Sequence, residues 1–80
     1  MHYVYMLRSI SHPEQTYIGY SKDFKKRIVA HNQGQSSHTS KYKPWELVTY
    51  IAFQDRKRAL AFEKYLKSHS GKAFANKRLW

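Results

Sequence analysis

The sequence predicts an α+β domain in which a three-stranded, mostly antiparallel sheet is flanked by helices, in the order ββαβαα. Two short runs of strand-forming residues open the chain, joined by a polar loop, and a third run lies between two helical segments. The 80 residues are too few for a doubly wound parallel sheet, because each parallel connection needs a crossover of about a dozen residues or more. The length allows one small core, so we expect a single domain over residues 1–80.

The first two strands are predicted by their aromatic and β-branched residues, which fill residues 3–7 and 16–20. Residues 9–15 are polar and include a proline, which indicates a hairpin loop. We therefore expect an antiparallel pair, with Tyr3 and Tyr5 on one face of the first strand.

The first helix follows the second strand. Ser21 is expected as its N-cap, Asp23 lies in its first turn, and Gly34 ends it. Phe24 and Ile28 recur at helical spacing and mark its buried stripe. The helix therefore presents one narrow apolar face to the sheet.

A polar, basic loop over residues 35–44 and a long strand over residues 45–53 are predicted next. The core candidates of this strand are Leu47, Val48, Tyr50 and Ile51. Strands that are this apolar fit a sheet with helices covering at least one face.

A second helix is predicted to begin at Asp55, which is a good N-cap, and to run to about Ser68. Gly71 is expected to end it. Residues 72–79 could then form a short third helix. These segments complete the predicted order of elements.

Charge narrows the class of partner. The 15 Lys and Arg residues exceed the five Asp and Glu residues, and the formal net charge is +10. Nucleic acid is favoured over an anionic membrane, because the cations are spread along the chain instead of lining one face of an apolar helix. The alternative is a solvated surface that only keeps the protein soluble. With no cysteine, and no apolar run of membrane or signal-peptide length, the chain is expected to lack disulfides and to be cytoplasmic, or nuclear if its source has a nucleus.

Arg27 and His31 are candidates for a site beside the first helix. At 100° per residue they lie one turn apart and flank Phe24 on the same side. We therefore expect both to point together from the edge of the buried face. The competing interpretation is that Arg27 is one more solvated surface cation.

Glu63 lies inside the apolar arc of the second predicted helix, between Ala59 and Leu60 when the helix is viewed end-on. A carboxylate in that position needs a partner, which could be a structural Lys or Arg or a divalent cation. The other acids are scattered over a loop, helix beginnings and a strand start, so a paired-carboxylate site is poorly supported; they are Glu14, Asp23, Glu46 and Asp55.

Tyrosines crowd the first two predicted strands, and aromatic core packing explains them as readily as catalysis does. This explanation is favoured for Tyr3 and Tyr50. Gly19 is more informative, since a glycine within a strand weakens it unless a group must approach the backbone closely.

In combination, these residues resemble the GIY-YIG nuclease family over nearly the whole chain. Tyr3-Val4-Tyr5 resembles the first half of the family signature, and Tyr17-Ile18-Gly19 is the second half intact, about a dozen residues later. The family's arginine falls on Arg27, its frequent His-Asn pair on His31-Asn32, and its metal-binding glutamate on Glu63. The likeness is closest to small single-domain members, and these are related to the N-terminal nuclease domain of the excision-repair endonuclease.

The chain departs from the family pattern at three places. Tyr3 replaces the first glycine of the signature, as is common in small members. Tyr20 stands where some members have a lysine after the second half. Asn76 lies near the position of an asparagine that helps to order the site in many members, but without a fixed register.

The resemblance implies a divalent-metal-dependent endonuclease that hydrolyses DNA phosphodiester bonds, with DNA repair or recombination as its setting. Glu63 would hold one Mg²⁺ or Mn²⁺ ion at the scissile phosphate, and Arg27 would donate to a non-bridging oxygen. Tyr17 would take a proton from the attacking water, with Tyr5 positioning the water or Tyr17. His31 would contact phosphate or assist proton transfer, and it rivals Tyr17 as the base because its ordinary pKa is nearer neutrality.

DNA is the expected partner, with RNA as a second candidate and no membrane involved. The residues expected to contact nucleic acid are Arg27, Lys41, Lys43, Lys67, Lys72 and Asn76. Target choice would rest on the loop over residues 35–44 and the terminal helix, or on a protein partner.

Two other functions stay open. One is a non-catalytic nucleic-acid-binding module of the same fold, although binding alone does not need Glu63. The other is a small basic protein of the ribosome or another RNA assembly. This function explains the charge, but it does not explain a carboxylate within the apolar arc of a helix.

Overall fold

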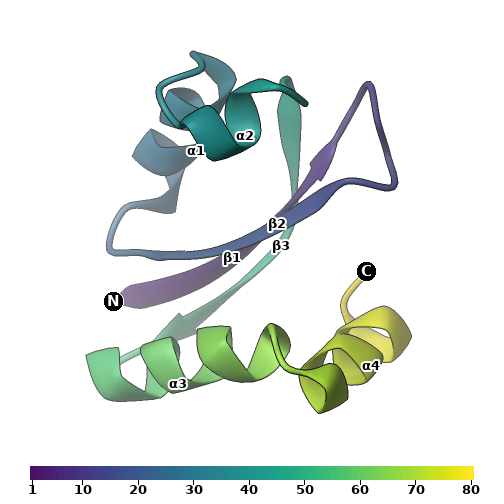
Figure 1. The fold of residues 1–80 in the computed structure, drawn as a ribbon. Helices are drawn as coiled ribbons and strands as arrows, with labels where there is room; N and C mark the ends of the chain where they lie inside the picture. Colours follow the sequence, from purple (N-terminus) through teal and green to yellow (C-terminus); the bar gives the residue numbers. More distant parts are fainter.

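The computed structural model describes residues 1–80 as three strands and four helices (Figure 1). The strands are β1 (His2–Ser9), β2 (Thr16–Ser21) and β3 (Trp45–Phe53). The helices are α1 (Phe24–Asn32), α2 (Ser37–Ser40), α3 (Arg56–Leu66) and α4 (His69–Arg78). None of the helices has the length and apolar character needed to cross a membrane.

The three strands form one sheet in the order β2-β1-β3, and both neighbouring pairs are antiparallel. The predicted α+β fold is therefore confirmed. Strand β1 lies in the centre, and its residues Val4 to Leu7 have no exposed surface. Because β2 and β3 each have one unpaired edge, side chains near the outer edge of β2 are accessible from the side of the sheet.

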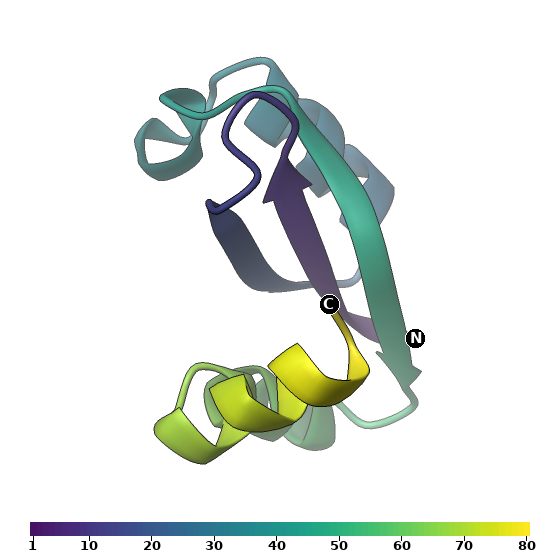
Figure 2. The same cartoon turned by 90° about the vertical axis from the view of Figure 1, so that its right-hand side faces the viewer.

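Helices cover both faces of the sheet. Figures 1 and 2 show α1 and α2 against one face and α3 and α4 against the other. On the α1 face, Tyr5 and Leu7 pack with Phe24 and Trp45. On the α3 and α4 face, a separate cluster is formed by Val4, Met6, Ala59, Leu66 and Ala75. The alternation of side chains along β1 thus builds two small cores, one on each face.

Two predictions about the first half of the chain are wrong in detail. The N-cap of α1 is Asp23 instead of Ser21, and its carboxylate accepts a hydrogen bond from the backbone N–H of Lys26 at 3.2 Å. The Ser21 hydroxyl accepts from the N–H of Asp23 at 2.9 Å and so shapes the turn before the helix. The predicted loop over residues 35–44 contains the short helix α2, which polar composition alone did not indicate.

The bounds of β3 agree with the prediction, but its core candidates do not all hold. Leu47 and Tyr50 are 38% and 47% exposed, whereas Trp45 is only 4% exposed. The β1–β3 register shifts between Met6 and Leu7, so the facing of β3 residues changes along the strand. A single alternating pattern therefore could not assign the buried face of β3.

Gly71 does not end α3 but lies buried within α4, and Ser68 caps α4 by accepting from the Gly71 N–H at 3.2 Å. A Cβ at Gly71 would overlap the carbonyl group of Tyr65 and lie 2.7 Å from the Cα of Leu66. The glycine is required because α4 crosses the end of α3 with backbone against backbone.

Replacing Gly71 with alanine should lower the free energy of unfolding by about 3 kcal/mol, because the methyl group meets rigid backbone that cannot move aside. For a domain of this size the melting temperature should fall by roughly 10–20 °C. Thermal denaturation followed by circular dichroism measures the effect. Ser70→Ala, at the neighbouring exposed position, serves as the control and should melt like the parent. Equal melting of the two variants would contradict the close helix crossing.

Candidate active site

Gly19 permits two tyrosines to pack against the backbone of β2. It pairs with Tyr5 across the β1–β2 ladder. A Cβ at Gly19 would lie 2.5 Å from the Cζ and hydroxyl oxygen of Tyr5, and 2.9 Å from the Cε2 of Tyr17. The expectation that a group approaches the backbone at Gly19 is confirmed, and the group is the ring of Tyr5.

Tyr5, Tyr17 and His31 gather on the α1 face of the sheet. The ring centroids lie 4.8 Å apart for Tyr17 and His31, 6.1 Å for Tyr5 and His31, and 6.2 Å for the two tyrosines. Strands β1 and β2 supply the tyrosines and α1 supplies the histidine. The structure thus brings together three of the five predicted catalytic side chains.

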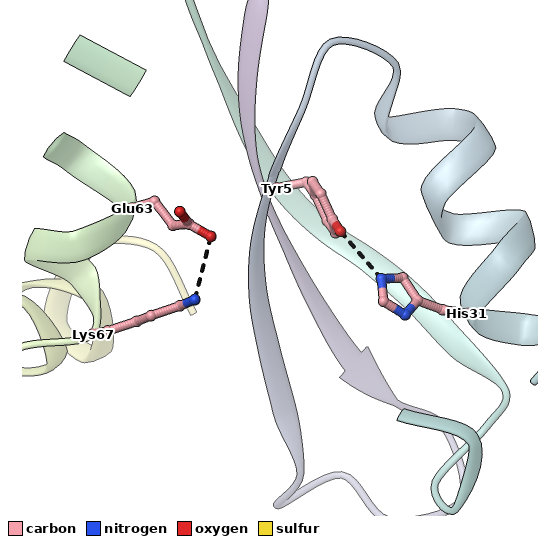
Figure 3. Close-up of polar contacts among 4 residues, drawn as sticks. All are labelled: Tyr5, His31, Glu63 and Lys67. Carbon is pink, nitrogen blue, oxygen red and sulfur yellow. Dashed lines mark hydrogen bonds and ion pairs between the residues drawn. The ribbon is translucent and has the colours of Figure 1, made fainter. Parts of the chain in front are cut away.

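His31 is held by hydrogen bonds on both ring nitrogens. Its Nε2 lies 3.1 Å from the Tyr5 hydroxyl (Figure 3), and its Nδ1 lies 2.7 Å from the Oγ1 of Thr39. Burial, and then the nearby positive charge of Arg27, lower the pKa of His31 and favour the neutral ring. A neutral imidazole donates through one nitrogen and accepts through the other, and burial keeps Tyr5 protonated, so Tyr5 can donate to Nε2 while Thr39 receives the Nδ1 proton.

His31 does not point from the helix edge beside Arg27, as the sequence predicted. It is 1% exposed, because α2 packs over it and supplies Thr39, whereas Arg27 is exposed. The following residue, Asn32, accepts from the N–H of Trp45 at 2.5 Å and donates to its carbonyl at 3.1 Å. The hydrogen bonds of His31 and Asn32 therefore hold α1 against β1 and β3.

Arg27 acts on Tyr5 through its charge. Burial raises the pKa of the Tyr5 hydroxyl, and the Arg27 guanidinium opposes this rise without overcoming it. The interaction with Tyr5 in turn raises the pKa of Arg27, and Tyr17 adds to the effect. Tyr5 therefore remains a hydrogen-bond donor, while Arg27, which takes part in no ion pair, keeps its charge available to a ligand.

Glu63 projects from α3 toward the strands, on the other side of the sheet from the Tyr5–His31 pair (Figure 3). Its side chain is 21% exposed, and its Oε2 lies 3.2 Å from the Nζ of Lys67 one turn later. Of the partners considered from sequence, the structure thus supplies a lysine. Lys67 is itself 53% exposed on a flexible stem, so it can leave the carboxylate when a stronger cation arrives.

The carboxylate of Glu63 is suited to a hard divalent cation, since it offers oxygen ligands and already attracts a positive charge. No group of three or more His, Cys, Asp or Glu side chains gathers anywhere in the chain, including around Glu63. An ion at Glu63 would therefore complete its coordination with water and phosphate oxygens.

A cleft of about 520 Å³ lies between β2 and the helices α3 and α4. It is lined by Tyr17 from the tyrosine cluster and by three of the predicted nucleic-acid-binding residues, Lys67, Lys72 and Asn76. Lys41 and Lys43 lie outside it and are exposed in the connection from α2 to β3. The cleft thus joins part of the predicted binding surface to the tyrosine cluster.

Sequence reasoning missed Thr39 and His38, both from the unexpected helix α2. Thr39 anchors His31, and the His38 ring lies 6.1 Å from that of Tyr17 and lines the same cleft. The only local signal for this helix was Ser36, a favourable N-cap residue, whose side chain forms no capping hydrogen bond.

Replacing Gly19 with alanine should reduce any hydrolytic activity of the site by about 100-fold, because the new methyl group displaces the Tyr5 and Tyr17 rings by a sizeable fraction of an ångström or more. Single-turnover cleavage at saturating protein measures the effect apart from binding. Tyr20→Phe is the control, since Tyr20 lies on the same strand, packs with the opposite core and loses only its hydroxyl contact with His2. Normal cleavage by the alanine variant would show that the ring positions at Gly19 do not matter.

The sequence and the fold are both similar to those of known proteins. Residues 1–78 match the model of the GIY-YIG catalytic domain. A UPF0213 protein of Staphylococcus saprophyticus is 36% identical over 70 residues, which cover 86% of this chain and 83% of that protein. The structure-specific endonuclease subunit slx1 of Talaromyces marneffei is 38% identical over 65 residues, which cover 74% of this chain but only 17% of that protein. The solution structure of a UPF0213 protein from Bacillus halodurans has a TM-score of 0.56 at 30% identity, over 95% of this chain and 82% of that one.

Proposed function

We propose that this chain, which belongs to the GIY-YIG family of nucleases, is an endonuclease that hydrolyses DNA phosphodiester bonds with the help of one divalent cation. The observation that carries the proposal is the gathering of Tyr5, Tyr17 and His31 beside an unpaired Arg27, with Glu63 facing the same strands from α3. A domain that only bound phosphate would need the arginine but neither the buried hydrogen-bonded tyrosine nor the carboxylate.

The proposed roles follow from exposure and hydrogen bonding. Arg27 is exposed and fully charged, so its planar guanidinium donates to the non-bridging phosphate oxygens. Tyr17 is half-buried and lines the cleft, where it takes the proton of the attacking water. Tyr5 is fully buried and protonated, so it positions Tyr17 without itself acting as the base.

His31 is proposed as a positioning residue. Both of its nitrogens are occupied, and its ring is closed off from solvent, so it holds the Tyr5 hydroxyl in place instead of touching phosphate. This assignment favours Tyr17 over His31 as the general base.

Glu63 would hold Mg²⁺ or Mn²⁺ through its carboxylate after Lys67 moves aside. When bound, the cation supplies Lewis-acid stabilisation of the charge that builds up on the phosphate. Lys67, released from Glu63, becomes an additional contact for the substrate backbone. We further propose that residues 1–80 work as one domain in DNA repair or recombination, with other proteins contributing to targeting.

Incubation with supercoiled plasmid and with branched DNA, in the presence of Mg²⁺, Mn²⁺ or a chelator, tests the proposal. Nicked or linear products should form with metal and disappear with chelator. The same assay on matched RNA identifies the polymer that the protein prefers. Binding without cleavage of any of these substrates, in either metal, would replace the proposal with the second candidate.

The second candidate is a nucleic-acid-binding module without activity. The Glu63–Lys67 ion pair favours it, because this pair satisfies the carboxylate without any metal. In that case calorimetric titration with Mn²⁺ should detect no binding that depends on Glu63.

A further inference from the structure

The cleft between β2 and the α3–α4 pair has an apolar wall that the proposed hydrolysis does not use. Ile18, Leu66, Ala75 and Trp80 contribute its apolar lining. Leu66 and Ala75 are fully buried members of the core, so this part of the lining is held in place. The volume of about 520 Å³ lies within the range of about 300–1,000 Å³ that is usual for small-molecule sites.

The other lining residues are polar or cationic. Lys67 and Lys72 contribute two ammonium groups, and Asn76 contributes an exposed amide that can both donate and accept. No acidic side chain lines the cleft. The occupant therefore combines a flat apolar part with negative charge and with hydrogen-bonding edges.

Trp80 is held so that it can act as a stacking surface. The guanidinium carbon of Arg8 lies over the indole, 5.5 Å from its centroid, and the residue packs against the core cluster of Val4 and Met6, so a base can stack only on the part of the ring that lines the cleft. The ring is therefore positioned before any ligand arrives, which reduces the entropy lost on binding.

We propose that this cleft binds one unpaired nucleotide of the substrate, with the base against Trp80 and the backbone phosphates at Lys67 and Lys72. A paired base exposes only its edges in the grooves of a duplex, whereas stacking on an indole requires a free base face. The inference rests on the proposed function, because Tyr17 lines the same cleft and an occupant there lies next to the tyrosine cluster. The preferred substrate is then DNA with an unpaired segment at the site of cleavage.

Binding to a short oligothymidylate and to a blunt duplex with the same number of phosphates tests the inference, in chelator and at constant salt. Trp80→Leu should weaken binding to the single strand by about 5- to 100-fold and leave duplex binding within about twofold, because duplex affinity rests on phosphate contacts. Trp80→Phe should retain part of the single-strand affinity. Phe74→Leu is the matched control, since Phe74 is an exposed aromatic of α4 that does not line the cleft, and it should bind like the parent.

Intrinsic fluorescence of the unaltered protein gives a second measurement that needs no variant. Trp45 is 4% exposed, so quenching by the oligothymidylate reports on Trp80. Single-strand binding without quenching, or equal loss of single-strand and duplex affinity in Trp80→Leu, would overturn the inference. These measurements involve no cleavage, so the two hypotheses can fail separately. A protein that cuts duplex DNA, but whose single-strand affinity does not depend on Trp80, would refute the inference alone. Trp80-dependent binding without any metal-dependent cutting would refute only the proposed hydrolysis.

Discussion

Replacing Glu63 with alanine should reduce metal-dependent cleavage by about 1,000-fold or more and leave DNA binding intact. The loss would reflect several kcal/mol of charge stabilisation from the cation that we propose this carboxylate holds. Binding in chelator should be unchanged or slightly tighter, since removal of Glu63 frees Lys67 for a phosphate. Plasmid nicking measures the first effect, and fluorescence anisotropy with labelled DNA measures the second.

The control for this variant is Glu14→Ala, which removes an exposed carboxylate from the β1–β2 loop and changes the net charge equally. It should cleave like the parent. Loss of folding is an unsuitable explanation for the Glu63 result, because an ion pair one turn apart on a helix, with its lysine exposed, is worth only about 0.3–0.5 kcal/mol. Undiminished cleavage by Glu63→Ala would remove the carboxylate from the mechanism.

Arg27→Lys should lower the rate of the chemical step by about 100- to 1,000-fold while DNA affinity changes little. Lysine keeps the charge that attracts DNA, but it lacks the planar fork that donates two parallel hydrogen bonds to a phosphate. It also changes the electrostatic environment of Tyr5, whose pKa Arg27 lowers against the effect of burial. Single-turnover rates at saturating protein separate the chemical step from binding.

Arg56→Lys is the matched control for Arg27→Lys, because Arg56 is an exposed arginine at the beginning of α3 that forms no ion pair. It should retain the parent rate. Similar rates for both variants would place Arg27 among the general surface cations. Slower binding with an unchanged chemical step would likewise assign Arg27 to substrate attraction alone.

The fold was predictable because its elements are marked locally. Alternating aromatic and aliphatic residues mark β1 and β2, and Asp55 marks the beginning of α3, where its carboxylate accepts from the N–H of Lys57 at 3.0 Å. The helix α2 was not predictable, since one turn of Ser, His and Thr residues has no apolar stripe of its own. Gly71 was wrongly predicted to end a helix for a related reason. The glycine is required by a contact between two helices, which no local pattern reveals.

The candidate site was likewise predictable only in part. Tyr5 and His31 could be named as candidates from sequence, but their hydrogen bond joins residues 26 positions apart. The burial of His31 depends on Thr39, and hence on the element that was missed. The role of His31 was therefore the least accessible to sequence reasoning, since it depends on what covers the ring.

The two cores on opposite faces of β1 tie the two halves of the proposed site to separately packed regions. The tyrosine cluster belongs to the face that α1 covers, and Glu63 belongs to the face that α3 covers. If α3 and α4 open as one cooperative unit, the proposed hydrolysis should stop while the aromatic half remains folded. Under mild denaturant, the cleavage rate should therefore decline over the same range in which amide hydrogen exchange in α3 accelerates. The activity of this protein would then report directly on sub-global opening.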